Sequence, residues 1–293
     1  MKSLHQYHPI VIFFYFFVVI GLTMFYMHPV LLGISFLGAV LLSLFIQRKK
    51  FLSSLKWLLP FMFIAAIINP LITHNGEIIL LYVNYQPITL EAIVYGFSMS
   101  VMLLSVVFWF GSFNEIMTSD KFLYLFGRIS PAVALLISLT MRLIPLFFLQ
   151  IKKITNAQRT IGMDPTTGSL WHRIKSAATI ISILISWALE NAIETADSMK
   201  ARGYGLKNRS TFSLFKFDRA DGIVTTVITC LFFVALISSY FGWNYFAYYP
   251  TFSTIELNMT TWIVFISYFA LIMLPIVIEL LEVLKWRSLK LNN

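Results

Sequence analysis

Six long apolar runs constrain the fold of this chain more than any other feature of its sequence. The runs have 16 to 23 residues, about the length a helix needs to cross a hydrocarbon core about 30 Å thick. Charged residues make up 12% of the chain, against about 25% in soluble domains. We therefore predict an all-α integral membrane protein with six transmembrane helices. The runs are Ile10–Met27, Val30–Ile46, Trp57–Ile72, Ala92–Phe113, Gly222–Phe241 and Trp262–Leu284.

The first run has a second interpretation as a cleaved signal peptide. No small-x-small cleavage site follows it, and His28 and Pro29 lead directly into the second run. A signal peptide ends at such a site. We therefore expect the first run to remain as a membrane anchor.

The basic residues predict the orientation in the membrane. The chain has 22 Lys and Arg against 13 Asp and Glu, and in so apolar a chain this excess indicates basic cytoplasmic loops rather than nucleic-acid binding. The connections around His28, from Thr73 to Glu91 and from Gly242 to Thr261 contain no Lys or Arg. Both termini are therefore predicted in the cytoplasm. The flanking basic clusters are Arg48, Lys49, Lys50 and Lys56, and Lys285, Arg287 and Lys290.

The middle segment, residues 114–219, divides the membrane regions 1–113 and 220–293. Two of its parts are apolar enough to form a further membrane hairpin, but that would place Arg142 in the hydrocarbon. A central arginine costs about 2.5 to 3.5 kcal/mol on insertion scales. We therefore predict that the whole segment lies on the cytoplasmic side, between spans four and five.

The middle segment reads as two long helices joined by a turn. The first is expected at Pro131–Ile161, where Pro145 should kink it. The turn contains Gly162 and Gly168. From Ser176 to Ala201, polar residues recur at three- and four-residue steps, which predicts an amphipathic helix of about 26 residues.

The sequence offers little for catalysis. It has no P-loop, no H-E-x-x-H motif and one cysteine, Cys230, so no cofactor, metal site or disulfide is predicted. Gly96 and Ser98 allow either an intramembrane serine protease or helix packing, and packing is favoured because no later span supplies a histidine base. Glu279 and Glu282 allow either a proton relay or, as we expect, pairing with Lys285 or Arg287 at helical spacing.

Arg202 stands at the predicted end of the second helix, between Ala201 and Gly203. One interpretation is a cation that favours the negative end of the helix dipole, followed by a glycine cap. The other is a planar guanidinium presented to a carboxylate of a partner. Arg159, near the end of the first helix, is the natural second contact for a partner with two equivalent subunits.

Several separate pieces resemble one family. They are Ile88-Thr89-Leu90-Glu91-Ala92, Thr118-Ser119-Asp120-Lys121, Arg142-Leu143-Ile144-Pro145, Met199-Lys200-Ala201-Arg202-Gly203-Tyr204, and Pro275 with Glu279, Glu282 and Trp286. Together, from about Ile88 to the C-terminus, they resemble the transmembrane energy-coupling component of energy-coupling factor transporters, bacterial importers of vitamins and trace metals. The A-R-G block within its helix is the most specific piece.

The resemblance implies a non-catalytic scaffold in the bacterial plasma membrane. Its two cytoplasmic coupling helices would dock on two ATP-binding-cassette ATPase subunits or domains, and their apolar faces would hold a small substrate-binding membrane subunit. The implied docking residues are Arg202, Ala201, Gly203, Arg159, Gln158 and Thr160, and the implied residues of coupling-helix structure are Arg142, Pro145, Gly162 and Gly205.

The first docking motif departs from the family pattern, which often reads A-Q-x-A-R-G. Aligning Ala157, Gln158 and Gly162 puts Ile161 where the arginine belongs, with Arg159 two residues earlier. Two residues along a helix correspond to a turn of about 200°. Unequal contacts with two non-identical ATPase domains are therefore a hypothesis for this chain.

Two rival functions remain. An intramembrane enzyme would need paired polar residues at matching depth in different spans, and the sequence shows none. A stand-alone permease or substrate-binding subunit would need polar residues lining its spans, where Asn69 is almost alone. Co-purification with ATPases separates a scaffold from such a carrier.

Overall fold

A computed structural model describes residues 4–46, 48–83, 85–127, 130–206, 215–255 and 258–291. The chain divides into two compact units. The first comprises Met1–Phe122 and Phe215–Asn293, and the second comprises Leu123–Leu214. The helices of the first unit are α1 (Pro9–Phe25), α2 (Pro29–Ile46), α3 (Arg48–Ile72), α4 (Leu90–Ile116), α8 (Arg219–Tyr240) and α9 (Met259–Leu291).

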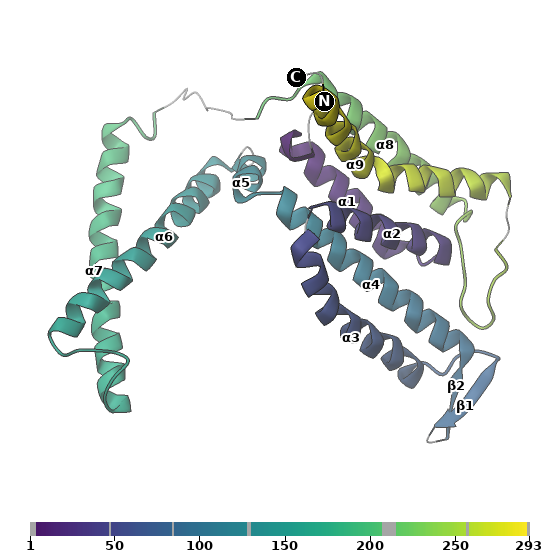
Figure 1. Cartoon of the computed structure of the whole chain (residues 1–293), viewed down its shortest axis with the longest axis horizontal. Coiled ribbons are helices and arrows are strands. Elements are labelled where there is room, and N and C mark those ends of the chain that lie inside the picture. Colours follow the sequence, from purple (N-terminus) through teal and green to yellow (C-terminus); the bar gives the residue numbers. More distant parts are fainter. Residues whose placement is uncertain are drawn as a thin grey trace. The chain divides into compact units, whose positions relative to one another are not determined.

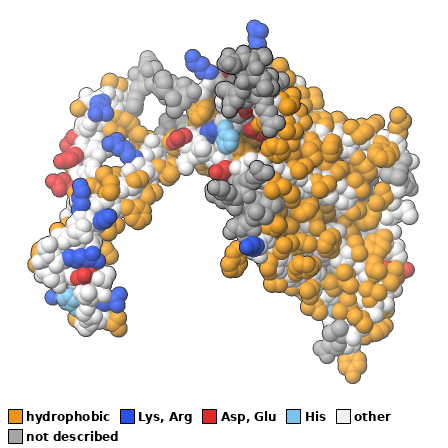
Figure 2. Space-filling view, viewed as in Figure 1, with side chains coloured by type: hydrophobic (Ala, Val, Ile, Leu, Met, Phe, Trp, Pro, Cys, Tyr) orange, Lys and Arg blue, Asp and Glu red, His pale blue; other side chains and the backbone are white. Residues whose placement is uncertain are grey.

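The first unit is a helical bundle in which α2 packs against α4 and α9, α4 also packs against α1 and α3, and α8 packs against α9 (Figure 1). Its largest fully buried side chains include Trp109, Tyr268 and Phe16. On the face in view the bundle is covered by hydrophobic side chains (Figure 2). An apolar exterior over an apolar core is what a lipid-facing bundle requires.

A buried hydrogen-bond cluster joins four helices of the bundle. The hydroxyls of Thr23 on α1 and Ser35 on α2 lie 2.7 Å apart, and Trp109 Nε1 on α4 donates to Ser35 Oγ at 3.1 Å. The Tyr268 hydroxyl on α9 lies 3.3 Å from Thr23 Oγ1. Because apolar surface gives no net drive for association between helices in lipid, such bonds and close packing hold the bundle together.

Glycines let the bundle helices approach closely. A Cβ on Gly38 of α2 would clash with the side chain of Ile272 on α9. A Cβ on Gly96 of α4 would lie 2.7 Å from the carbonyl oxygen of Ala66 on α3. This confirms the packing role expected for Gly96.

The connection between α3 and α4 contains two antiparallel strands, β1 (Ile79–Val83) and β2 (Gln86–Thr89), so the expectation of an all-α chain was wrong here. The strands are rich in β-branched and aromatic residues, which favour pairing, and Tyr85 takes a positive φ of 66° between them. Thr89 Oγ1 accepts from the N–H of Ala92 and caps α4. The buried Glu91 carboxylate accepts from the N–H of Ile78 at 3.2 Å and fixes the start of the hairpin.

Carboxylates of α8 and α9 hold the first described residues of the chain. The N–H of Leu4 donates to Glu279 Oε1 at 2.9 Å, and the N–H of His8 donates to Asp221 Oδ1 at 3.0 Å. Asp221 is fully buried. The Glu279 carboxylate therefore binds a backbone group. The expected pairing with Lys285 or Arg287 stays a prediction, and the side chain of Arg287 lies outside the described residues.

A short helix, α5 (Ser119–Gly127), begins within the first unit and contributes a further contact to the N-terminal segment. Lys121 Nζ donates to the carbonyl oxygens of His5 at 2.8 Å and Ile116 at 3.0 Å. Burial lowers the pKa of this lysine, because a charged amine is less stable away from water. These two bonds make Lys121 a link between the end of α4, the start of α5 and the segment around His5.

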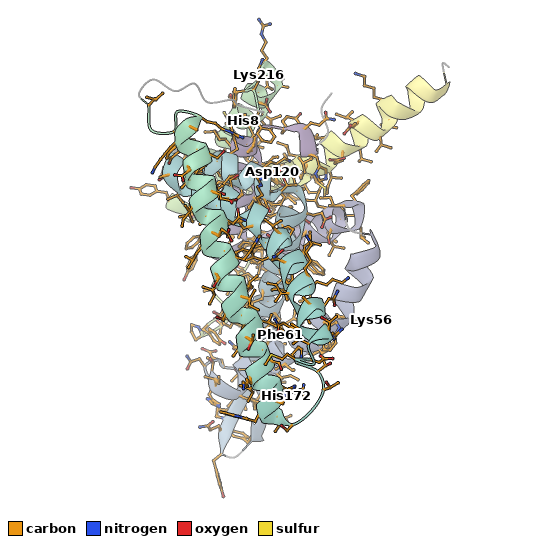
Figure 3. The ribbon with its side chains drawn as sticks, turned by 90° about the vertical axis from the view of Figure 1, so that its left-hand side faces the viewer. His8, Lys56, Phe61, Asp120, His172 and Lys216 are labelled. Carbon is orange, nitrogen blue, oxygen red and sulfur yellow. The ribbon has the colours of Figure 1, made fainter. Side chains whose placement is uncertain are left out.

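The second unit contains the two long helices, α6 (Pro131–Thr160) and α7 (Leu170–Ala201), which contact each other (Figure 1). The rings of Phe147 and Trp187 meet edge to face with centroids 5.6 Å apart. At 32 residues α7 is longer than predicted. It begins earlier because Ser169 Oγ accepts from the N–H of His172 and caps it at the turn, where Figure 3 shows His172.

Within the part of the chain that the structure describes, seven helices are long and apolar enough to cross a membrane: α2, α3, α4, α6, α7, α8 and α9. The apolar helix α1, with 17 residues, is slightly shorter. Length and composition thus admit α6 and α7 as spans, which the six-span prediction excludes. The six-span count and the cytoplasmic place of α6 and α7 stay predictions.

We expect Gly38→Ala to destabilise the bundle, because the new methyl group would clash with the fully buried Ile272. Overpacking of this kind costs about 1 to 3 kcal/mol. Thermal unfolding of the purified protein in detergent would measure it. The matched control is Gly33→Ala on the same helix, where a Cβ meets nothing within 4 Å. Equal melting temperatures for both variants would contradict this packing.

Candidate functional site

The C-terminus of α7 ends in a Schellman cap in which Arg202 is the cap residue, directly after the last helical residue, Ala201. Gly203 takes a positive φ of 80°, and its N–H donates to the carbonyl oxygen of Lys200 at 2.9 Å. The N–H of Tyr204 donates to the carbonyl oxygen of Met199 at 3.0 Å. This pair of bonds defines the motif. Residues 199–204 are called the α7 tip below.

The C-terminus of α6 ends in the same way. Gly162 has a φ of 82° and its N–H donates to the carbonyl oxygen of Arg159 at 3.0 Å. The N–H of Met163 donates to the carbonyl oxygen of Gln158 at 2.9 Å. Residues 158–163 are called the α6 tip below. Ile161 therefore occupies the cap position in α6 that Arg202 occupies in α7.

Arg159 is bonded within the turn that follows its helix. Its Nε lies 3.4 Å from Asp164 Oδ2, and its side chain is 48% exposed. Asp164 Oδ1 also accepts from the N–H of Thr166 at 2.9 Å and from its hydroxyl at 2.7 Å. The bonds from Thr166, together with the Arg159 guanidinium, lower the pKa of the Asp164 carboxyl. The carboxylate therefore stays ionised at neutral pH and offsets the charge of Arg159.

Arg202 is in a different electrostatic situation. Its side chain is exposed, and among the residues that the structure describes it has no ion-pair partner. The neighbouring Lys200 lies 4.0 Å from Asp197, with both side chains mostly in water. Ala201 and Gly203 carry too little side chain to cover the guanidinium. The guanidinium of Arg202 is thus exposed, and its contact with a partner stays a prediction.

The remaining predicted residues lie on α6 or beyond the α7 tip. Arg142 and Pro145 are exposed near the middle of α6, which continues through the proline. The kink at Pro145 stays a prediction. The Thr160 hydroxyl donates to the carbonyl oxygen of Ala157 at 2.7 Å, and Gly205 has a positive φ of 98° beyond the α7 tip.

The two tips are far apart because α6 ends where α7 begins. Phe147 and Trp187, which lie 14 residues before Ile161 and 15 residues before Arg202, are in contact. At about 1.5 Å per residue the two tips therefore lie at most about 44 Å apart along the helices. Basic and acidic side chains are interspersed along the two helices (Figure 2). One protein groove cannot contact both tips at this separation.

Sequence reasoning missed two parts of this site. Sequence analysis placed a turn at Gly162 and Gly168 and gave Asp164 no role, because its pairing with Arg159 depends on a backbone reversal that spacing does not show. The nearby bond from Arg173 Nε to the carbonyl oxygen of Pro165, at 3.0 Å, was also missed. Among the described residues, no group of three His, Cys, Asp or Glu side chains is placed to hold a metal ion.

Residues 2–213 match the family model of CbiQ, described as a cobalt transport protein. The chain belongs to the CbiQ family. Its family membership and apolar helices make it a multi-pass membrane protein. The matched residues include both tips.

Individual relatives give the same picture. The chain is 30% identical over 165 residues to an uncharacterized protein of Mycoplasma pneumoniae, a match covering 53% of this chain and 38% of the relative. It is 34% identical over 106 residues to the energy-coupling factor transporter transmembrane protein EcfT of Lactobacillus helveticus, covering 36% of each. It is 27% identical over 187 residues to EcfT of Bacillus selenitireducens, covering 60% of this chain and 69% of the relative. The match spans little more than a third of the first two relatives.

We expect Gly203→Ala to loosen the α7 tip. An L-residue in the left-handed region costs about 1 to 2 kcal/mol, so the bond from the Tyr204 N–H to Met199 should open more often. Hydrogen exchange at the Tyr204 amide would show faster exchange. Lys200→Ala, at an exposed helical position, serves as control and should leave that rate unchanged. Unchanged exchange in Gly203→Ala would show that the cap does not depend on glycine.

Proposed function

We propose that this CbiQ-family chain is the energy-coupling transmembrane component of an ATP-driven importer of a vitamin or trace-metal micronutrient. The observation that carries the proposal is the exposed Arg202 guanidinium, held at a rigid helix cap on an amphipathic helix. The names of the EcfT relatives, each an energy-coupling factor transporter protein, support it. The chain itself would have no catalytic step.

In this proposal the membrane is crossed six times, by α1 to α4, α8 and α9. The helices α6 and α7 lie along the cytoplasmic surface, and both chain ends are cytoplasmic. The charge on α6 and α7 supports this arrangement, because charged residues within a span are costly. These residues are Arg142, Lys152, Lys153, Arg159, Arg173, Lys175, Glu190, Glu194, Asp197 and Lys200.

The same arrangement gives the chain three parts: membrane regions 1–113 and 220–293, and a coupling region 114–219. The change between compact units at Phe122/Leu123 and at Leu214/Phe215 lies near these boundaries. Since the second unit contains both tips, movement applied there would act on a body that packs by itself.

Two ATP-binding-cassette ATPase subunits or domains would dock at the two tips. At the α7 tip, Arg202 meets a carboxylate, with Ala201 and Gly203 leaving it unobstructed. The other contact lies at the α6 tip, around Gln158, Arg159 and Thr160. ATP-driven movement of the ATPases would then shift the coupling helices.

A small substrate-binding membrane subunit would lie against the apolar faces of the coupling helices. Large apolar side chains on α6 and α7 are exposed, as expected of a surface that binds an apolar partner. They include Leu136, Ile144 and Phe148 on α6, and Ile181, Ile185 and Leu189 on α7. Movement of the tips would tilt that subunit through these contacts.

We expect Arg202→Ala to uncouple one ATPase. Removing one partner of a buried charge pair costs about 2 to 5 kcal/mol, so ATPase binding and transport should fall sharply. Arg159→Ala should have a smaller effect, because this arginine is already paired with Asp164. The measurement is ATPase subunits retained on the tagged chain together with substrate uptake. The exposed Lys200→Ala is the control, and equal, complete loss for Arg159→Ala and Arg202→Ala would refute the difference.

Cysteine labelling tests the topology. In a Cys230→Ser background, which removes the only cysteine, a membrane-impermeant maleimide added to intact cells should label Glu77→Cys but not Lys152→Cys. Both positions are exposed, so both should react after the cells are permeabilised. Labelling of Lys152→Cys in intact cells would place α6 outside and overturn the proposed arrangement.

A further inference from the structure

The two coupling helices share one cap geometry but present opposite chemistry. The cap residue has φ −94° and ψ 4° in α6, and φ −83° and ψ 7° in α7. Each is followed by a glycine with a φ near 80°. Equivalent backbones therefore present Ile161 on one helix and Arg202 on the other, and the Ile161 side chain is 73% exposed.

The Arg159–Asp164 pair does not turn the α6 tip into a second cationic tip. The Asp164 carboxylate lies 3.4 Å from Arg159 and is held ionised by Thr166. The pair of Arg159 and Asp164 carries no net charge, and it joins the last turn of α6 to the loop that follows. An exposed isoleucine beside a neutralised charge favours an apolar contact, because removing its side chain from water stabilises a complex.

We infer that the α6 tip docks through Ile161 into an apolar groove on one ATPase subunit, while the α7 tip docks through Arg202 into an acidic groove on the other. The two ATPase grooves are then chemically different, and each helix end selects its own subunit. This rests on the proposed function and refines which residue makes the first contact.

Selection follows from the cost of the wrong pairing. An arginine in the apolar groove would be a buried charge without a partner, and an isoleucine in the acidic groove would leave carboxylates unpaired. Both mismatches disfavour the exchanged arrangement, which is how interfaces gain specificity. The contact between Phe147 and Trp187 lies between the two tips, which are separated by up to about 44 Å along the helices. Each tip therefore binds its own subunit independently.

The test uses the full chain, co-expressed with the ATPase subunits of its complex and purified in detergent through a tag on this chain. Quantitative mass spectrometry measures each ATPase subunit per chain after washes at low and high salt. The variants are Ile161→Arg, the conservative Ile161→Leu, Arg202→Ile and the double exchange. The exposure of Ile161 and Arg202 means that none of these alters a buried contact.

Ile161→Arg should weaken the binding of one ATPase subunit to the chain at least about tenfold. Arg202→Ile should weaken the binding of the other subunit by a similar factor. Ile161→Leu should stay within about twofold of the wild type. High salt should release the subunit at the α7 tip more readily than the one at the α6 tip, because salt screens charge pairs.

Retention of both subunits by Ile161→Arg, with wild-type affinity or tighter, would overturn the inference. So would a wild-type complex in which the two ATPase chains have the same sequence. These results leave the proposed function intact. A wild-type preparation that binds no ATPase at all would contradict the proposed function itself.

Discussion

The left-handed backbone of one glycine after each long helix is the constraint on which the candidate site depends. It lets the N–H groups of two successive residues turn back onto the last carbonyl oxygens. The helix therefore stops at a defined residue, and the preceding side chain is placed at the end of the rod rather than along its side. Gly162 and Gly203 impose this geometry, and chemistry enters only through the residue before each.

The two units meet different physical demands. In the bundle, close approach at Gly38 and Gly96 and the bonds around Ser35 and Thr23 fix the helices against one another. The α6–α7 unit contains few buried side chains, among them Ile154 and Ile180. Its shape rests on the caps, on the bonded turn and on the contact between the two helices. A fixed bundle and a sparsely packed pair suit a division between anchor and moving part.

Much of the fold was readable from the sequence, because a hydrocarbon core demands long apolar helices. The runs predicted at Ala92–Phe113 and Gly222–Phe241 correspond to α4 and α8, each extended by a few residues. The hairpin before α4 was missed because its strands are short and their pairing depends on local turn geometry. The start of α7 was missed because the recurrence of polar residues begins at Ser176, whereas the helix begins at the cap formed by Ser169.

The candidate site was predictable in part. Aligning the glycines indicated that Ile161 takes the arginine position, and the caps place it there. The pairing of Arg159 with Asp164 was not predictable, because it crosses a reversal of the chain. The carboxylates that hold Leu4 and His8 come from residues more than 200 positions away, which no local pattern can show.

Those carboxylates give the chain a particular order of assembly. The N–H of Leu4 donates to Glu279, 275 residues later in the chain. Lys121, from the middle of the chain, donates to the carbonyl oxygen of His5 in the same short segment. Because synthesis runs from the N-terminal to the C-terminal side, the segment Leu4–His8 is made well before its binding partners on α8 and α9. This segment can therefore take its place in the bundle only after α8 and α9 have been made.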